Sequence, residues 1–183
     1  MEEPERQAAL QPYLLPDERI LWTGRPGSRR WFTAADIYLV PFSLFWGGFA
    51  LFWEGLVLTS GAPWPFALWG IPFIVIGQYL IWGRFLYKRW DRARTTYAVT
   101  SRRLVVLKGG RLQSLFLNQL PVVNQSSGRD ASGTLIFGSA PSGYALWANT
   151  GLGWFYQHAA PLTFDDIPDV NIVYGLVASA AAR

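Results

Sequence analysis

Two long apolar runs constrain this chain most. The first, Ile37 to Leu58, reads "IYLVPFSLFWGGFALFWEGLVL" and contains one charged residue, Glu54. At about 1.5 Å per residue these helical residues would cover roughly 33 Å, enough to cross the hydrocarbon core of a bilayer. The second, Phe66 to Tyr87, begins "FALWGIPFIVIGQYLIW", and its terminal cations can extend to the interface. We expect two transmembrane helices; the alternative, a buried helical hairpin of a soluble protein, fits poorly because no polar stripe runs along either segment.

The segments flanking these runs predict their orientation. The joining segment, Thr59 to Pro65, has no cation and is short, so the two spans should be antiparallel neighbours. Cations gather on the other side of both spans: Arg25, Arg29, Arg30, Arg84, Lys88, Arg89, Arg92 and Arg94. By the positive-inside rule we expect a multi-pass protein of the plasma (inner) membrane with both termini in the cytoplasm.

Polar and small residues lie within the spans. Glu54 and Gln78 are the intramembrane polar candidates. Such carboxylates are often functional, although Glu54 lies within about one turn of the outer surface and could be merely interfacial. Ser43, Gly47, Ala50 and Glu54 share one face of the first span, and Gly70 and Gly77 lie in the second. Small residues let helices approach closely, either within the hairpin or between copies of the chain.

Composition excludes several kinds of chemistry. Hydrophobic residues make up 51% of the chain and charged residues 15%, and 10 residues are Trp, which suits a membrane interface. With no Cys and one His, the chain cannot form disulfides, thiolate metal sites or histidine clusters. Only Asp165, Asp166 and His158 could suggest catalysis, and the two aspartates are better explained as residues at the start of a helix. We therefore expect no enzyme activity, no catalytic residue, no metal and no cofactor.

Beyond residue 94 the pattern changes to short alternating strands. The expected strands are "TTYAVT", "RRLVVLK", "LQSLFL", "VVNQ", "TLIFGS", "YALWA" and "GWFYQ", which favours a small antiparallel barrel or sandwich. An amphipathic helix over residues 168 to 181 should follow, with Ile167, Val170, Val173 or Tyr174, and Val177 on its apolar stripe.

One further strand is expected before the membrane hairpin. In "DERILWTGRP", Ile20 and Trp22 alternate with Leu21 and Thr23, and so short a strand needs a partner in a sheet. We expect it to pair with the strands after Thr95, so that the hairpin is an insertion in one β domain. The predicted organisation is a mobile tail (1–13), a first strand (14–30), the hairpin with its basic flanks (31–94) and the rest of the domain (95–183).

Four motifs in order resemble the membrane-attached bacterial PH-like domain family. They are "LLPDERILWTGRP" before the spans, "YAVTSRRLVVLKGG" after them, "GTLIFG" in mid-domain and "FDDIPDVNIVYGLV" near the end. The resemblance covers the chain from about Leu14 to Val177. It implies a PH-like fold, a strongly bent sheet of about seven strands closed by a C-terminal helix, and it implies no known reaction.

The remaining hypotheses concern partners. The cations beside the spans can fix topology alone, or they can recognise anionic lipid headgroups, at about 1 kcal/mol for each cation. The loop "SSGRDASG" could cradle an anion or be a simple hairpin loop. Nucleic acid is not expected, because the cations are committed to the membrane surface. Our main hypothesis is an adaptor that binds a membrane protein or copies of itself; the alternatives are an anionic-lipid sensor and a small transport or channel subunit.

Overall fold

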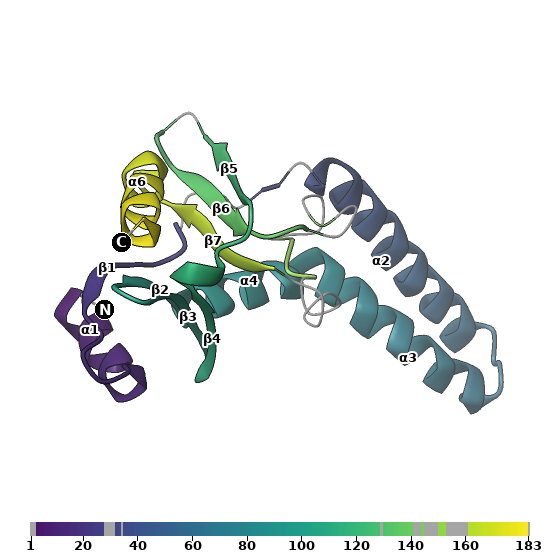
Figure 1. The fold of residues 1–183 in the computed structure, drawn as a ribbon. Coiled ribbons are helices and arrows are strands. Elements are labelled where there is room, and N and C mark those ends of the chain that lie inside the picture. Colours follow the sequence, from purple (N-terminus) through teal and green to yellow (C-terminus); the bar gives the residue numbers. More distant parts are fainter. Residues whose placement is uncertain are drawn as a thin grey trace. The chain divides into compact units, whose positions relative to one another are not determined.

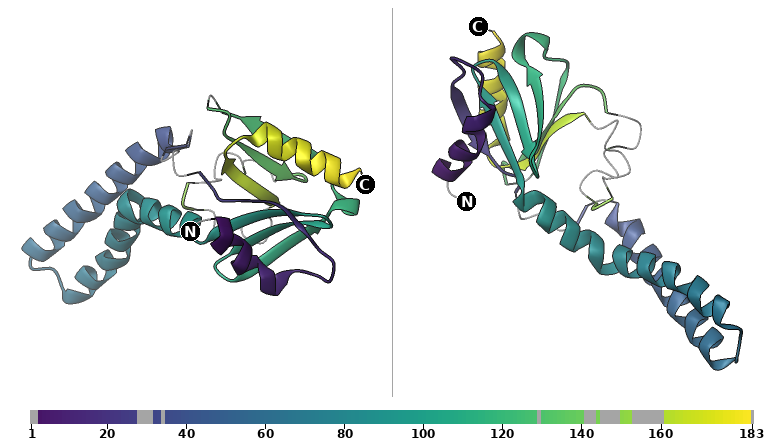
Figure 2. Two further views of the ribbon diagram at one scale, coloured as in Figure 1. Left: turned by 90° about the vertical axis from the view of Figure 1, so that its left-hand side faces the viewer. Right: turned by 90° about the horizontal axis from the view of Figure 1, so that it is seen from below.

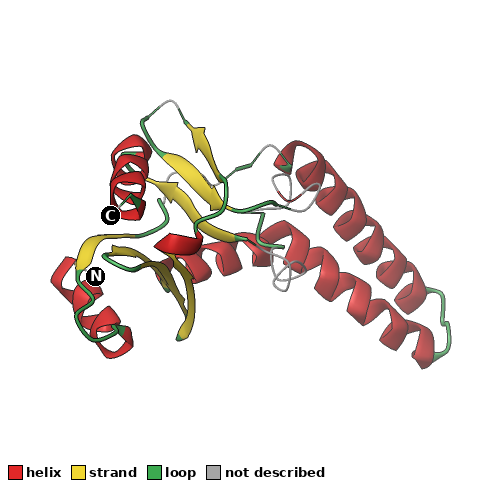
Figure 3. Cartoon of the chain, in the orientation of Figure 1, coloured by secondary structure: helices red, strands yellow, loops and turns green. Residues whose placement is uncertain are grey.

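The computed structural model describes residues 3–27, 32–33, 35–128, 130–140, 144, 150–152 and 161–182. The protein is α+β and forms two compact units (Figures 1 and 3). The β unit comprises Met1–Arg30, Trp90–Ser142 and Tyr156–Arg183; the hairpin unit comprises Trp31–Arg89 and Gly143–Phe155.

Sheet A of the β unit has four antiparallel strands in the order β1-β2-β3-β4. Their bounds are Ile20–Gly24, Thr95–Thr100, Arg103–Lys108 and Arg111–Phe116. In β1, Ile20 lies opposite Thr100 and Gly24 lies opposite Tyr97 of β2. The predicted pairing of the strand before the hairpin with the strands after it is confirmed.

Sheet B contains β5 (Val123–Ser127), β6 (Gly133–Phe137) and β7 (Leu162–Ile167), also antiparallel, and is followed by α6 (Val170–Ala181). A short 3-10 helix, η3 (Leu117–Gln119), precedes β5. Helix α6 begins two residues after the expected start, because Pro168 lies in the turn before it. Figure 2 shows the two sheets and α6 in two further views.

The core of the β unit is centred on Phe164 of β7. Its ring stacks on Tyr97 at 4.9 Å and meets Phe137 edge-on at 5.2 Å. Ile167, Val170, Val173 and Val177 are buried in the same cluster, which confirms the predicted stripe with Val173 rather than Tyr174 facing inward. Burial of these side chains from both sheets and α6 joins them into one core.

The N-terminal segment differs from the expected mobile tail. Residues 3–13 form α1 (Glu3–Leu10) and the 3-10 helix η1 (Gln11–Tyr13). Leu10 is buried against Ala98 and Val105, on the face of sheet A that does not contribute to the main core. The sequence shows few apolar residues here, but Leu10 packs on the open face of sheet A and the Tyr13 carbonyl accepts a hydrogen bond from Arg103.

Two expectations for the C-terminal half also change. Asp165 and Asp166 lie in β7, not at the start of the helix, and Asp169 occupies the N-cap position of α6 instead. The expected strands at residues 144–148 and 153–157 lie outside the described residues, apart from Tyr144.

The hairpin unit is built from α2 (Asp36–Thr59), α3 (Trp64–Gln78), the π-helical turn η2 (Tyr79–Gly83) and the first part of α4 (Arg84–Ala93). Helices α2 and α3 lie side by side and antiparallel (Figures 1 and 2). The helices at residues 36–59 and 64–93 are each long and apolar enough to cross a membrane.

Most of their large apolar side chains are exposed. Phe45 is 75% exposed on α2, and Trp69 is 69% exposed on α3. The core helix of a soluble protein would instead be mostly buried, so the expected alternative of a buried soluble hairpin does not match this arrangement.

Candidate functional site

A buried ion pair lies in the hairpin unit, near the cytoplasmic ends expected for the two spans. Arg84 donates from Nη1 to Oδ1 of Asp36, and both side chains are almost fully buried. The other Asp36 oxygen accepts hydrogen bonds from the Thr33 N–H at 2.5 Å and the Thr33 hydroxyl at 2.9 Å. Asp36 therefore holds Thr33, which precedes α2, and Arg84, the first residue of α4, at the same time.

The π-helical turn η2 explains how Arg84 reaches this position. The backbone N–H of Arg84 bonds to the carbonyl of Tyr79, five residues back, which frees the carbonyl of Leu80. The guanidinium of Arg84 then donates from Nε to that carbonyl at 2.8 Å. The turn is thus coupled to the ion pair through a single side chain.

The connection between β6 and β7 also contacts this turn within the hairpin unit. The hydroxyl of Tyr79 donates to the Gly151 carbonyl at 2.9 Å. A Cβ atom at Gly151 would lie 2.3 Å from the Arg84 carbonyl oxygen, and the backbone there has a positive φ of 86°. Only glycine permits this close approach.

Two cations expected to face lipid are buried instead. Arg84 is 1% exposed and Lys88, one helical turn later, is 7% exposed. The two residues are four positions apart and so share one helical face, and that face points into the protein. We therefore do not retain them as headgroup ligands.

In the β unit, Arg92 fastens the segment that precedes the hairpin. Its Nη1 donates to the carbonyl of Gly27 at 2.7 Å, and the N–H of Gly27 donates to the carbonyl of Asp166 at 2.7 Å. The carboxylate of Asp166 lies 3.9 Å from the same nitrogen of Arg92. The chain is thus held on both sides of the hairpin insertion.

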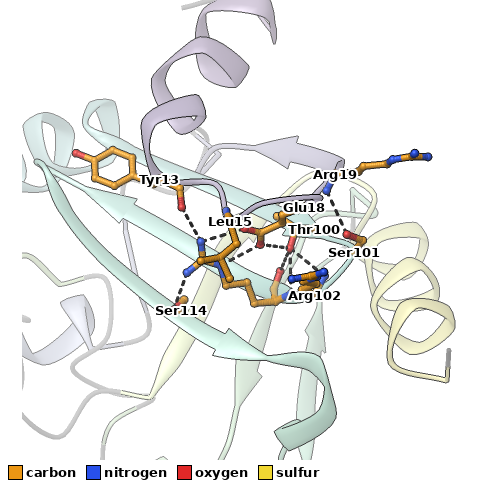
Figure 4. A network of polar contacts seen from close by, with 9 residues as sticks. Tyr13, Leu15, Glu18, Arg19, Thr100, Ser101, Arg102 and Ser114 are labelled. Atoms are coloured by element: carbon orange, nitrogen blue, oxygen red, sulfur yellow. Dashed lines mark hydrogen bonds and ion pairs between the residues drawn. The ribbon is translucent and has the colours of Figure 1, made fainter.

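A second buried network ties residues 13–18 to β2 and β3 (Figure 4). Arg103 donates from Nε and Nη2 to the two oxygens of Glu18 at 2.9 and 3.0 Å, and from Nη2 to the carbonyl of Tyr13 at 2.6 Å. The hydroxyl of Thr100 donates to Glu18 at 2.7 Å.

Two groups in the β unit have shifted pKa values. Burial raises the pKa of the Glu18 carboxyl, but hydrogen bonds from Arg103, the Leu15 N–H and Thr100, with the charge of Arg103, outweigh it and leave the pKa below 4.5. Burial, reinforced by the nearby charge of Asp165, raises the pKa of Tyr97 well above 10.0. Its neutral hydroxyl accepts a hydrogen bond from the Asp165 N–H at 3.1 Å.

Other expected cations are exposed or fall outside the described residues. Arg89 and Arg94 are exposed, and the guanidinium of Arg94 lies over the ring of Trp90, 4.3 Å from its centroid. Arg25 is half-buried and has an interaction partner. Arg29 and Arg30 lie outside the described residues.

Small residues form the contact between α2 and α3, and of the two intramembrane polar candidates only Glu54 reaches it. A Cβ atom on Gly77 would be 3.0 Å from the Cα of Gly47, so the two helix backbones meet there. The expected packing of small residues within the hairpin is confirmed. The carboxylate of Glu54 lies against Gly70, where a Cβ atom would be 1.8 Å from Oε2, whereas Gln78 is exposed. Oε2 of Glu54 is buried and accepts no hydrogen bond from the described residues.

Comparisons with protein-family models, with curated proteins and with solved structures found no match. Within the described residues no group of three or more His, Cys, Asp or Glu side chains could hold a metal ion. The charged groups described above are used mainly to hold the chain together.

Several residues of these networks were missed from sequence. Glu18, Arg103 and Asp36 each form an ion pair with a residue that is 48 or more positions away in sequence. The available signals were weak: an acid three residues after Thr33, and charged residues inside two of the family-like motifs.

Proposed function

We propose that this chain is a non-enzymatic protein of the inner membrane that presents a cytoplasmic PH-like domain as an adaptor or self-association platform. The observation that carries the proposal is that two apolar helices with exposed side chains are inserted between β1 and β2, which are paired neighbours in one sheet. A domain interrupted in this way is tethered to the bilayer by two chain segments.

The exposed surface of the helices supports membrane insertion. Within the described residues, α2 and α3 together expose apolar side chains on most sides, and water would disfavour this strongly. Trp64 and Trp82, which are 73% and 66% exposed, lie near opposite ends of the second span, where aromatic side chains suit the membrane interfaces.

The order of elements supports a PH-like domain. The described residues of the β unit form seven strands and a final helix, in the number and order that the resemblance implies, although the strands make two sheets of four and three rather than one bent sheet. Because β1 precedes the hairpin and β2 follows it, both ends of the membrane anchor connect directly to the same sheet of the domain.

The outer side of α6 is the interaction surface that we assign to the adaptor role. Ile172 is 72% exposed on the side of α6 away from the buried Val170, Val173 and Val177, and the helix contains no charged residue. An uncharged, partly apolar helix face on a tethered domain is suited to a protein partner or to a second copy of the chain.

Single-cysteine variants test the orientation, because the chain has no Cys of its own. In intact cells, a membrane-impermeant maleimide should label Ser60→Cys, between α2 and α3, but should label Ser127→Cys on β5 only after permeabilisation. Labelling of both in intact cells, or of neither, would refute the proposed topology.

Cysteine crosslinking tests the adaptor role. Ile172→Cys on α6 should give a crosslinked dimer or a crosslinked partner in membranes, whereas Ser127→Cys, on the exposed strand β5, serves as the control. Equal crosslinking of both variants would show random collision, and no crosslinking of Ile172→Cys would count against α6 as the interaction surface.

A further inference from the structure

Strand register shows which end of sheet A is connected to the hairpin: β1 ends there before the hairpin, and β2 begins there after it. Gly24 at the end of β1 lies opposite Tyr97, Thr95 at the start of β2 lies opposite Lys108, and Lys108 lies opposite Arg111. The β3–β4 turn, Lys108 to Arg111, is therefore at the same end of the sheet as the two hairpin connections. The N–H of Gly109 donates to the carbonyl of Arg94 at 3.2 Å and holds the turn beside that residue.

This end of the sheet collects exposed cations. Arg94, Lys108 and Arg111 are exposed, and we call these three residues the turn cations. Lys108 forms an ion pair with Asp91 at 2.8 Å. Within the described residues, neither Arg94 nor Arg111 forms an ion pair.

Asp91 offsets the charge of Lys108 but leaves the turn cations with a net positive charge. Lys108 and Arg111 are directly opposite one another on neighbouring strands, where like charges destabilise a sheet. The two residues between them, Gly109 and Gly110, have φ values of 54° and 85°, and a Cβ atom on either would meet nothing within 4 Å. The turn is thus short, bare and open to an approaching surface.

Chain length places this end near the bilayer if the hairpin spans it. Ala93, the end of α4, is six helical residues beyond Tyr87, the expected end of the second span, a rise of about 9 Å. Arg94 follows immediately, and a Debye length of about 8 Å lets an anionic surface act at that distance.

We propose that the turn cations dock this end of sheet A onto the anionic inner leaflet, with Arg94, Lys108 and Arg111 binding lipid phosphates. The inference rests on the proposed membrane topology. It replaces Arg84 and Lys88, which are buried, with residues of the β3–β4 turn as the principal headgroup contacts. Each cation strengthens docking about fivefold, so the three together strengthen it on the order of a hundredfold.

The test uses the full-length chain in nanodiscs, with a fluorophore on Gln113→Cys, which is exposed on β4 two residues beyond the turn. A nitroxide on the lipid headgroup quenches the fluorophore when the turn is docked. Quenching should be stronger in phosphatidylcholine with phosphatidylglycerol than in phosphatidylcholine alone, and high salt should reduce it. Replacing the three turn cations with Gln should remove the dependence on phosphatidylglycerol.

The matched control replaces Arg19 and Arg102, two exposed cations at the opposite end of the same sheet, with Gln. This variant should keep the full response to phosphatidylglycerol. Quenching that is equal in both lipids, or equally reduced by both sets of substitutions, would overturn the docking proposal. It would leave the turn available to another anion, such as an acidic protein segment.

A second label separates this failure from failure of the proposed function. A fluorophore on Phe52→Cys, which is exposed on α2, should be quenched by nitroxides on the lipid acyl chains. No quenching there would refute membrane insertion itself. Quenching of Phe52→Cys without any lipid response at Gln113→Cys would refute only the docking of the turn.

Discussion

Arg103 donates two hydrogen bonds to the carboxylate of Glu18, at 2.9 and 3.0 Å, across a sequence separation of 85 residues. One partner precedes the hairpin and the other follows it. Both are buried; Glu18 also accepts hydrogen bonds from the Thr100 hydroxyl and the Leu15 N–H, and Arg103 also donates to the Tyr13 carbonyl. The β unit is therefore closed by a buried ion pair across the insertion as well as by strand pairing.

The first prediction concerns the loss of that charge. Glu18→Gln should lower the free energy of unfolding by about 3 kcal/mol, because it leaves the Arg103 guanidinium buried without a counter-charge. Thermal unfolding of the detergent-solubilised full-length chain, followed by circular dichroism, measures the effect. Asp17→Asn, at the exposed neighbouring position, is the control and should change stability by less than about 0.5 kcal/mol. Equal unfolding temperatures for the two variants would contradict the role of the pair.

The second prediction concerns pH. Because the pKa of Glu18 is lowered in the folded protein, the unfolded chain takes up the proton first as the pH falls. The stabilisation by Glu18 is complete above its ordinary value of 4.5 and is lost as the pH falls through the lower folded pKa. The stability difference between the unmodified protein and Glu18→Gln should therefore shrink below that value. A difference that stays constant with pH would show that Glu18 is not ionised in the fold.

The third prediction concerns the ion pair of the hairpin unit. Asp36→Asn should destabilise the protein by about 3 kcal/mol, because Arg84 is almost fully buried and would lose its counter-charge. The rate of proteolysis of the detergent-solubilised chain measures this loss of stability. Arg89→Gln, which removes an exposed cation from the next turn of α4, should have little effect. If both variants are cleaved at the same rate, Arg84 does not depend on Asp36.

The elements that the sequence predicts well are those with a long local pattern. The two apolar helices and the buried stripe of Val170, Val173 and Val177 follow directly from residue type and spacing. β7 was not predicted, because Asp165 and Asp166 also suit a helix start. Asp166 is accommodated in a strand by Arg92 and Gly27, which come from distant parts of the chain.

The candidate site was harder to predict for the same reason. The spacing of Arg84 and Lys88 shows that they share a helical face, but it does not show whether that face points to lipid or to protein. Arg84 points into the protein because it donates to Asp36 and to the Thr150 carbonyl of the β6–β7 connection, and neither residue is near it in sequence. The position of the Gly109–Gly110 turn beside Arg94 likewise follows from strand register and not from the local sequence.

The last prediction concerns close packing in the hairpin. Gly77→Leu should separate α2 from α3, because even a Cβ atom at this position would be 3.0 Å from the Cα of Gly47. Gly55→Leu is the matched control, since a Cβ atom there would meet nothing within 4 Å. In detergent, Gly77→Leu should lower the temperature at which the chain aggregates and Gly55→Leu should not, because only the first substitution pushes two backbones apart. If Gly55→Leu is the more damaging variant, Gly47 and Gly77 do not form the main contact that holds the two helices together. The face of α2 around Gly55 would then contact another protein or another copy of the chain.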